Sequence, residues 1–363
     1  MKHHPENDPK YQGLNVSKGV EKPPTINPYL KEKHKRKKYS VDEYVERILA
    51  GDITVLSQAV TLVESSRADH QQLAQAIIER CLPHAGKSIR VGITGVPGAG
   101  KSTSIDSFGV HLIKQGKKLA VLAIDPSSER TKGSILGDKT RMERLAVQEN
   151  AFIRPSPTAG SLGGVARKTR ESIILCEAAG FDYIFVETVG VGQSETAVHS
   201  MVDFFLLIQL AGTGDELQGI KRGIMEMADG IVINKADGDN IGKANIAQNH
   251  FKNALHLFPL AESGWSPEVL TYSGYYDLRI VEIWEMIDRY VAFVKESGYF
   301  DVKRNRQSTY WMYETINEYL RNDFYRNETI ERLMPKLERE VLGNKKSSFI
   351  AAKEALDAYY KKG

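Results

Sequence analysis

Residues 91–103 read VGITGVPGAGKST, and this stretch decides the fold class. Residues 95–102 match the pattern G-x-x-x-x-G-K-[ST] between an apolar run and a helical pattern. The glycines let the backbone wrap closely, so that successive N–H groups can point at phosphate oxygens. The positive end of the following helix adds to the attraction for anions. The stretch predicts a phosphate-binding loop between a strand and a helix of an α/β domain.

The residues expected to surround the phosphates are those of the loop and the first helical turn: Gly95, Val96, Pro97, Gly98, Ala99, Gly100, Lys101, Ser102 and Thr103. We expect the Lys101 ammonium to reach the β- and γ-phosphates and the Ser102 hydroxyl to bind Mg²⁺. The pattern therefore predicts a nucleoside triphosphate and a magnesium ion as cofactors.

Short apolar runs alternate with helical stretches from residue 88 onward. The runs are 89–94, 118–125, 151–155, 182–188, 203–210, 229–234 and 268–273. Their nearly continuous hydrophobicity is typical of strands covered on both faces, which predicts a mostly parallel sheet with right-handed helical crossovers. After about residue 280 the apolar runs give way to helical patterns with exposed charge, at 280–297 and then at 307–363.

Composition shifts suggest four regions. These are a flexible N-terminal arm (1–39), an N-terminal helical region (40–87), a P-loop domain (88–295) and a C-terminal helical extension for dimerisation (296–363). The second region begins with SVDE, where Ser40 and Glu43 form a capping box. Long helical tails of this kind often pack against a second copy of the chain.

Asn234-Lys235-Ala236-Asp237 closes one of the later strands with the pattern N-K-x-D. An aspartate carboxylate can accept hydrogen bonds from N1–H and the 2-amino group of guanine, whereas adenine offers neither donor. The Lys235 stem can lie on the ring. Ser273 and Gly274 follow the last strand, where a backbone N–H can meet the guanine oxygen. The motif predicts GTP as the nucleotide.

Acidic residues close two other strands, at Asp125 and at Glu187 of the phrase Glu187-Thr188-Val189-Gly190. The carboxyl ends of parallel strands share one edge, so these acids should converge near the metal. We expect Ser102, Asp125, Asp138 and Glu187 as metal ligands, and Lys101, Glu187 and Asp125 as catalytic residues. No glutamine directly follows Gly190, so Gln193 is only a candidate for positioning water, and unassisted hydrolysis should be slow.

The composition of the chain argues against several classes of protein. The chain has 363 residues, a formal net charge of +3 and two cysteines, which is typical of a reducing compartment without a thiolate metal site. No apolar run approaches 18 residues, and the N-terminus lacks a secretory signal pattern. The basic run KEKHKRKK (31–38) is interpreted as a solvated leader. We therefore expect a cytoplasmic protein without nucleic-acid or membrane partners.

Four phrases resemble the methylmalonyl-CoA mutase-associated GTPases, which are cobalamin-handling chaperones: GVPGAGKST, DPSSERTKGSILGDKTRM, ETVGVGQSE and AGTGDELQGIKRGIMEMAD. The likeness covers about residues 40–300. It implies a homodimer built partly through C-terminal helices. It also implies a GTP-gated interaction with a B12-dependent mutase, in which the chaperone loads adenosylcobalamin, rejects damaged cofactor and protects the enzyme.

The resemblance also assigns residues. It makes 214–221 an additional mobile loop, with Asp215 and Lys221 as its charged members. Lys132 departs from a glycine of the family pattern, and Tyr272-Ser273-Gly274 departs from the usual Ser-Ala pair.

Four alternatives stay open at this point. They are a nickel- or other metal-inserting GTPase, a kinase linked to basic amino acid transport, a ribonucleoprotein or targeting GTPase, and a chaperone whose client is a related acyl-CoA mutase. A His-rich tract or a Cys-x-x-Cys motif would favour the first, and an RNA-binding module would favour the third.

Overall fold

The structure is a computed structural model, and it describes residues 39–124, 141–155, 162–188, 194–211 and 222–360. Asp125, Asp138, Gln193, Asp215 and Lys221 lie outside these residues. The chain divides into two units, Met1–Tyr39 and Ser40–Gly363. The four predicted regions are not tested by this division and stay predictions.

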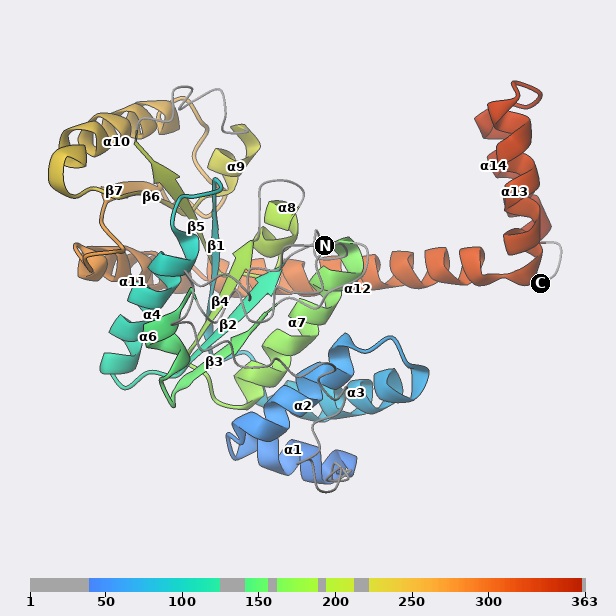
Figure 1. The fold of residues 1–363 in the computed structure, drawn as a ribbon, viewed down its shortest axis with the longest axis horizontal. Coiled ribbons are helices and arrows are strands. Elements are labelled where there is room, and N and C mark those ends of the chain that lie inside the picture. Colours follow the sequence, from blue (N-terminus) through green and yellow to red (C-terminus); the bar gives the residue numbers. More distant parts are fainter. Residues whose placement is uncertain (1–38, 125–140, 156–161, 189–193, 212–221, 361–363) are drawn as a thin grey trace, which may run out of the picture. The chain divides into compact units, whose positions relative to one another are not determined.

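A seven-stranded parallel sheet forms the centre of the second unit (Figure 1), as the apolar runs predict. Its strand order is β3-β2-β4-β1-β5-β6-β7, and every neighbouring pair is parallel. The strands are β1 (Ile89–Gly95), β2 (Leu119–Ile124), β3 (Ala151–Arg154), β4 (Tyr183–Thr188), β5 (Phe204–Leu210), β6 (Gly230–Asn234) and β7 (Glu268–Thr271). All seven carboxyl ends therefore lie along one edge, which we call the carboxyl edge.

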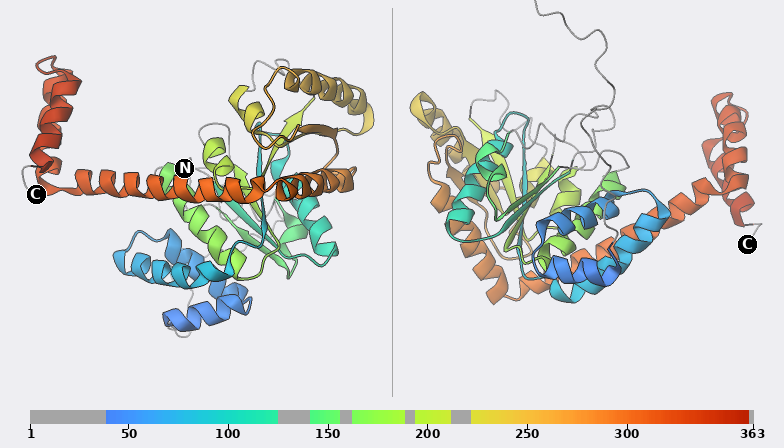
Figure 2. Two further views of the ribbon diagram at one scale, coloured as in Figure 1. Left: turned by 180° about the vertical axis from the view of Figure 1, so that it is seen from behind. Right: turned by 60° about the horizontal axis from the view of Figure 1, so that its bottom comes forward.

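Helices cover both faces of the sheet (Figures 1 and 2). One face packs against α4 (Lys101–Lys114), α6 (Glu143–Ala146) and α11 (Ile280–Glu296), where the Trp284 ring stacks on Phe185 at 6.0 Å. The other face packs against α7 (Leu162–Ala178), α8 (Ser194–His199), α9 (Arg222–Met227) and α10 (Ile241–Leu255). Burial on both faces explains why the strands are nearly continuous in hydrophobicity.

Three helices precede the sheet: α1 (Val41–Leu49), α2 (Ile53–Glu64) and α3 (Ala68–Cys81), followed by a short 3₁₀ turn at Leu82–His84. The predicted capping box is confirmed, because Glu43 N donates to Ser40 Oγ at 3.2 Å and Ser40 N donates to Glu43 Oε2 at 2.8 Å. The three helices pack on one another and on α7. Arg154, at the end of β3, also forms an ion pair with Glu64 of α2.

The C-terminal part consists of α12 (Tyr299–Arg326), α13 (Glu328–Leu342) and α14 (Ser348–Tyr360). The helix expected from 307 starts at Tyr299 instead, directly after Gly298, whose left-handed φ of 72° ends α11. Leu337, Ala351 and Ala355 form a small core with Phe324 of α12. Within the described residues, no helix has both the length and the apolarity needed to cross a membrane.

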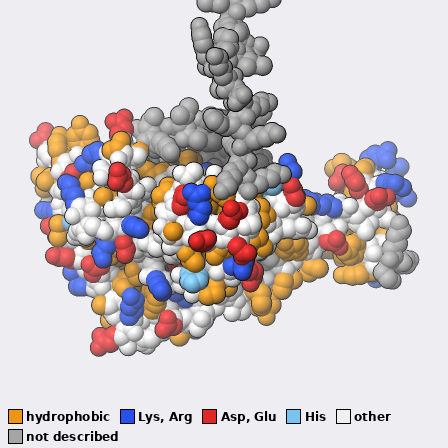
Figure 3. All heavy atoms as spheres, turned by 90° about the horizontal axis from the view of Figure 1, so that it is seen from below, with side chains coloured by type: hydrophobic (Ala, Val, Ile, Leu, Met, Phe, Trp, Pro, Cys, Tyr) orange, Lys and Arg blue, Asp and Glu red, His pale blue; other side chains and the backbone are white. Residues whose placement is uncertain are grey.

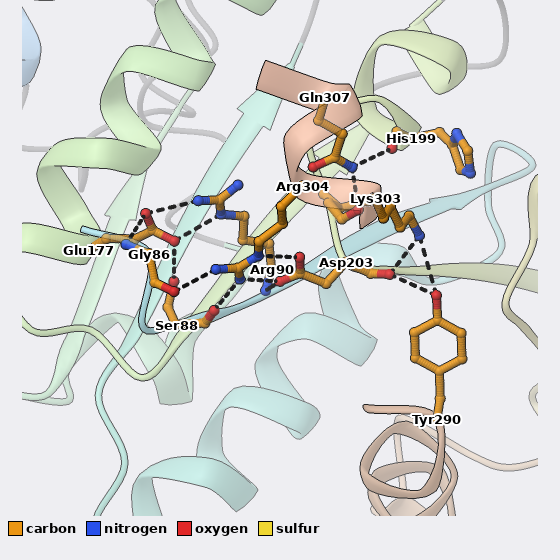
Figure 4. Close-up of polar contacts among 11 residues, drawn as sticks. Gly86, Ser88, Arg90, Glu177, His199, Asp203, Tyr290, Lys303, Arg304 and Gln307 are labelled. Atoms are coloured by element: carbon orange, nitrogen blue, oxygen red, sulfur yellow. Dashed lines mark hydrogen bonds and ion pairs between the residues drawn. The ribbon is translucent and has the colours of Figure 1, made fainter. Parts of the chain in front are cut away.

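A network of buried charges attaches the start of α12 to the opposite edge of the sheet, the amino edge (Figure 4). The Asp203 carboxylate, just before β5, accepts hydrogen bonds from Arg304 Nε at 2.8 Å and Nη2 at 2.6 Å, and from the Arg90 backbone N–H at 2.8 Å. The Arg90 guanidinium in turn donates two bonds to Glu177 of α7, at 2.8 and 2.9 Å. The network thus joins β1, β5, α7 and α12.

Candidate nucleotide site

The turn from β1 into α4 has room only for glycine at two positions. A Cβ on Gly95 would lie 2.2 Å from the carbonyl oxygen of Ile208 on β5, and Gly95 has φ +155°. A Cβ on Gly100 would lie 2.6 Å from Asn234 Nδ2, and Gly100 adopts the left-handed φ of +87°. The loop therefore lies directly against the ends of β5 and β6. This close approach explains both fixed glycines of the pattern.

Lys101 begins α4, and its ammonium folds back across the loop. Nζ donates to the carbonyl oxygens of Gly95 at 2.8 Å and Val96 at 3.5 Å. Burial lowers the pKa of Lys101, and the nearby charges of Glu187 and Glu195 oppose this effect. An ammonium has three N–H donors, so the two carbonyls leave capacity for a phosphate oxygen.

The predicted metal ligands that the structure describes are Ser102 and Glu187, and they are neighbours. Ser102 Oγ donates to Glu187 Oε1 at 3.3 Å. Thr188 Oγ1 donates to Thr94 Oγ1 at 2.9 Å, which holds the ends of β4 and β1 together. No group of three or more His, Cys, Asp or Glu side chains that could hold a metal occurs within the described ranges. Mg²⁺ usually takes one or two protein oxygens with water and phosphate, so this pair fits it.

Asn234, at the end of β6, connects the phosphate loop with the segment after β7. Its Nδ2 donates to the Ala99 carbonyl at 2.7 Å. Its Oδ1 accepts from the backbone N–H groups of Lys235 at 2.8 Å and Gly274 at 3.0 Å. A single buried amide therefore fixes three parts of the predicted site. Lys235 adopts a left-handed φ of 60°, which is uncommon for a residue with a side chain.

Asp237 and Ser273 also come together as the sequence predicts. Ser273 Oγ donates to Asp237 Oδ2 at 2.6 Å. A further contact was not predicted from the sequence. The hydroxyl groups of Tyr272 and Ser104 form a hydrogen bond, with 2.6 Å between their oxygen atoms. Burial raises the pKa of Tyr272, so this phenol stays protonated. No local pattern marks Ser104, because its partner lies 168 positions away.

A separate cavity of about 520 Å³ lies away from these residues. It is lined by α9, the segment after α10 and the start of α12, and it includes Asp229 and Lys303. These two side chains pair with each other, with Lys303 Nζ 3.3 Å from Asp229 Oδ2. The predicted nucleotide residues belong to the carboxyl edge and do not line this cavity.

The class of protein follows from this arrangement. A parallel sheet in which G-x-x-x-x-G-K-S joins β1 to α4, with N-K-x-D at the end of β6, defines a P-loop GTPase. The family described as "Methylmalonyl Co-A mutase-associated GTPase MeaB" matches residues 56–329. The chain belongs to this family, and the sequence resemblance is confirmed.

Individual similar proteins support the assignment of the chain to this family. The chain is 48% identical over 290 residues to "GTPase ArgK" of Escherichia coli, which covers 80% of this chain and 88% of that protein. It is 44% identical over 329 residues to "Methylmalonic aciduria type A homolog, mitochondrial" of Mus musculus, covering 88% and 79%. A crystal structure of a protein called "LAO/AO transport system kinase" matches with a TM-score of 0.72 and 39% identity, covering 88% and 98%.

Proposed function

We propose that this GTPase is a chaperone of a B12-dependent methylmalonyl-CoA mutase, or of a related acyl-CoA mutase. In this role it gates the loading of adenosylcobalamin and protects the mutase. The observation that carries the proposal is the family match over 56–329, because the family's name states an association with methylmalonyl-CoA mutase. The mouse relative, named for methylmalonic aciduria, supports it.

In the proposed reaction the phosphates of GTP lie in the loop 95–100, whose backbone N–H groups bind their oxygens. Lys101 balances the negative charge that develops on the terminal phosphate. Ser102 and Glu187 would hold Mg²⁺, which neutralises phosphate charge when it is bound. Asp125 and Asp138 belong to the proposed metal set from the sequence alone.

The proposed base-reading residues are Asn234, Lys235, Asp237, Ser273 and Gly274. The Asp237 carboxylate accepts from guanine N1–H and the 2-amino group, and the Ser273 hydroxyl orients it from 2.6 Å. The Gly274 N–H, which donates to Asn234 Oδ1 at 3.0 Å, would turn to the guanine oxygen when the nucleotide binds. The bond to the carboxylate contributes about 1.5–3 kcal/mol and the neutral bond about 1 kcal/mol, so contacts with a ligand can replace both.

We further propose a homodimer formed through the C-terminal helices. Figure 3 shows hydrophobic side chains along these helices. Large apolar residues that are about half exposed or more include Tyr313, Tyr319, Leu320, Leu342, Phe349 and Ile350. Contiguous exposed apolar surface of this extent is typical of an interface. A cytoplasmic location is part of the same proposal, whereas the mouse relative is named mitochondrial.

The protein of the similar crystal structure is named a transport-system kinase, which makes phosphoryl transfer to a protein the second candidate activity. The two activities differ in where the γ-phosphate goes. A chaperone GTPase releases it as inorganic phosphate, whereas a kinase leaves it on an acceptor side chain. Labelled γ-phosphate therefore separates them.

The test combines hydrolysis with binding. Purified mutase without cofactor should raise GTP hydrolysis by this chain and co-elute with it when a non-hydrolysable GTP analogue is present. Lys101→Ala serves as the matched control and should show no stimulated hydrolysis. Hydrolysis that mutase leaves unchanged, together with separate elution, would contradict the chaperone role. Label on an acceptor protein would support the kinase.

A further inference from the structure

The loop Ser273–Arg279 follows β7 and carries strained backbone. Ser273 and Leu278 form an antiparallel bridge with hydrogen bonds of 3.2 and 3.0 Å. Asp277 and Arg279 adopt left-handed φ values of 53° and 58°. Such a conformation costs about 1 kcal/mol or more for a residue with a side chain, and it persists only where its surroundings hold it.

Little apolar burial holds the tip of this loop. Tyr275 and Tyr276 are 77% and 61% exposed, and Leu278 is 47% exposed. The two tyrosine rings contact each other edge to face at 4.9 Å. Since apolar packing contributes little here, the polar attachments of the loop determine its conformation.

One attachment leads to the base-reading residues. Ser273 Oγ donates to Asp237 Oδ2 at 2.6 Å, and Gly274 N donates to Asn234 Oδ1 at 3.0 Å. These are the contacts through which the start of the loop would align the groups that read guanine. Any rocking of the loop would therefore move the Gly274 N–H and the Ser273 hydroxyl together.

The other attachment is Arg144 of α6. Its Nη1 and Nη2 donate to Asp277 Oδ2 and Oδ1 at 2.7 and 3.1 Å, which is a two-pronged contact. Its Nε donates to the buried carboxylate of Asp106 on α4 at 2.6 Å. Asp106 also accepts the Leu145 N–H at 2.8 Å, and Ser107 Oγ donates to Asp277. Arg144 thus joins the loop to the helix that starts at the phosphate-binding turn.

We propose that Arg144 is a positioning residue for the guanine nucleotide. By pairing with Asp277 it holds loop 273–279 on α4 and α6, and it thereby sets how long the nucleotide stays bound. Arg144 itself does not touch the nucleotide in this scheme. The inference rests on the proposed base-reading role of Asp237, Asn234 and Gly274.

The solvent exposure of the Arg144–Asp277 pair limits how much its loss can speed nucleotide release. The Arg144 and Asp277 side chains are 44% and 46% exposed, so solvent screens the pair. The two-pronged geometry of the pair and the strained backbone of Asp277 increase the expected effect of losing the pair. The hydrogen bonds from Arg144 lower the pKa of Asp277, so this carboxylate remains charged at neutral pH. We expect loss of the pair to speed nucleotide release about three- to ten-fold.

The experiment measures release of fluorescent GDP into excess unlabelled GDP for Arg144→Ala, Asp277→Ala and the double variant. Each single variant should release GDP about three- to ten-fold faster than the parent protein. The double variant should be no faster than the faster single variant, because both changes remove one contact. Release rates that multiply in the double variant would overturn the proposed pair.

The matched control is Arg289→Ala. Arg289 forms a similarly exposed two-pronged pair with Glu268 at the amino end of β7, with Nε 3.2 Å from Oε1 and Nη2 2.8 Å from Oε2. Its loss should leave GDP release unchanged. Equal acceleration in Arg289→Ala and Arg144→Ala would show general loosening and would overturn the positioning role.

Asp277→Asn removes the charge of residue 277 without disturbing its left-handed backbone, so we expect a milder effect than from Asp277→Ala. Asparagine adopts the left-handed region readily and can still accept from Ser107, so release should fall between those of the parent and Asp277→Ala. If the parent protein binds no GDP, the proposed base assignment fails together with this inference. If the parent binds GDP and Arg144→Ala releases it at the parental rate, only this inference fails.

Discussion

The two edges of the central sheet hold their polar groups in opposite ways. At the amino edge the charges are paired and buried, since the Arg90 and Glu177 side chains are 5% and 0% exposed. Asp203, with a side chain 2% exposed, is paired with Arg304. At the carboxyl edge, Lys101 bonds to carbonyl oxygens and Asp237 accepts a serine hydroxyl. The amino edge joins ions to ions, whereas the predicted nucleotide residues Lys101 and Asp237 join ions to neutral groups.

This difference separates structural attachment from ligand binding. Removing one member of a buried ion pair leaves an uncompensated charge and costs several kcal/mol. Exchanging a hydrogen bond between an ion and a neutral group for one to a ligand costs less, because such a bond contributes about 1.5–3 kcal/mol and the ligand replaces it. The carboxyl edge can therefore change partners when a nucleotide binds, whereas the amino edge keeps α12 attached to the sheet.

The largest expected effect tests the amino edge. Glu177→Gln leaves the Arg90 guanidinium buried without its counter-charge, so the free energy of unfolding should fall by about 3 kcal/mol or more. Urea unfolding measures this change. Glu268→Gln, in the exposed pair with Arg289, is the control and should stay close to the parent value. Equal stability of Glu177→Gln and parent would show that the amino edge does not depend on its ion pairs.

The stability of Glu177→Gln should also depend on pH differently from that of the parent protein. Burial alone would raise the pKa of Glu177, but the charge and hydrogen bonds of Arg90 outweigh it, so the pKa falls below 4.5. A carboxyl with a lower pKa in the folded state stabilises the fold above the unfolded pKa. This contribution is lost as the pH falls from about 4.5 through the folded pKa. Glu177→Gln should lack that part of the acid-induced loss of stability.

Lys101→Ala tests the carboxyl edge. Removing the cation expected at the terminal phosphate should lower GTP turnover about 10²- to 10³-fold, because no other described side chain of the loop supplies this charge. The melting temperature should fall less than in Glu177→Gln, since the hydrogen bonds of Lys101 within the described residues go to carbonyl oxygens. Loss of stability comparable with that of Glu177→Gln would contradict the distinction between the two edges.

Asp237→Asn tests base reading at the same edge. An amide offers a donor where the carboxylate only accepts, so preference should shift from GTP toward xanthosine triphosphate, with about 100-fold loss for GTP. Competition between the two nucleotides for the protein measures the shift. Retained guanine selectivity would show that Asp237 does not read the base.

Local pattern was sufficient to predict much of this architecture. The seven strands, their parallel arrangement and the phosphate loop follow from short apolar runs and from fixed spacings within a few residues. The bond between Ser104 and Tyr272 and the pair of Arg144 with Asp277 join positions 168 and 133 apart. Neither pair carries a periodic or spaced signal, because only the packing of α4 and α6 beside the loop after β7 brings them together.

The amino edge was likewise hidden from the sequence. Arg90 and Asp203 begin two apolar runs, where a charge is ordinarily interpreted as a solvated strand end. The start of α12 differed from expectation too, at Tyr299 instead of 307, and this earlier start places Lys303 and Arg304 in the helix. Their partners, Asp203 and Tyr290, lie outside α12, and no pattern along the sequence indicates that these residues meet.

The smallest expected effect concerns His199, a titratable residue that lies at the amino edge with the paired charges (Figure 4). Burial and, to a smaller extent, the positive charge of Lys303 lower the pKa of His199 to about 4, against the opposing charge of Asp229. A histidine with a lower pKa in the folded state binds its proton mainly in the unfolded chain. Stability is therefore full above the ordinary value of 6.5 and falls as the pH drops toward 4.

This loss should reach about 1–2 kcal/mol at pH 5, a pH that lies above the range in which the contribution of Glu177 is lost. His199→Gln, which cannot take up the proton, should show a smaller difference in unfolding free energy between pH 7 and pH 5. Urea unfolding at both values measures it, with the exposed His256 changed to Gln as the control. If His199→Gln and parent lose the same stability, then His199 is protonated without cost, and the amino edge tolerates an additional charge after all.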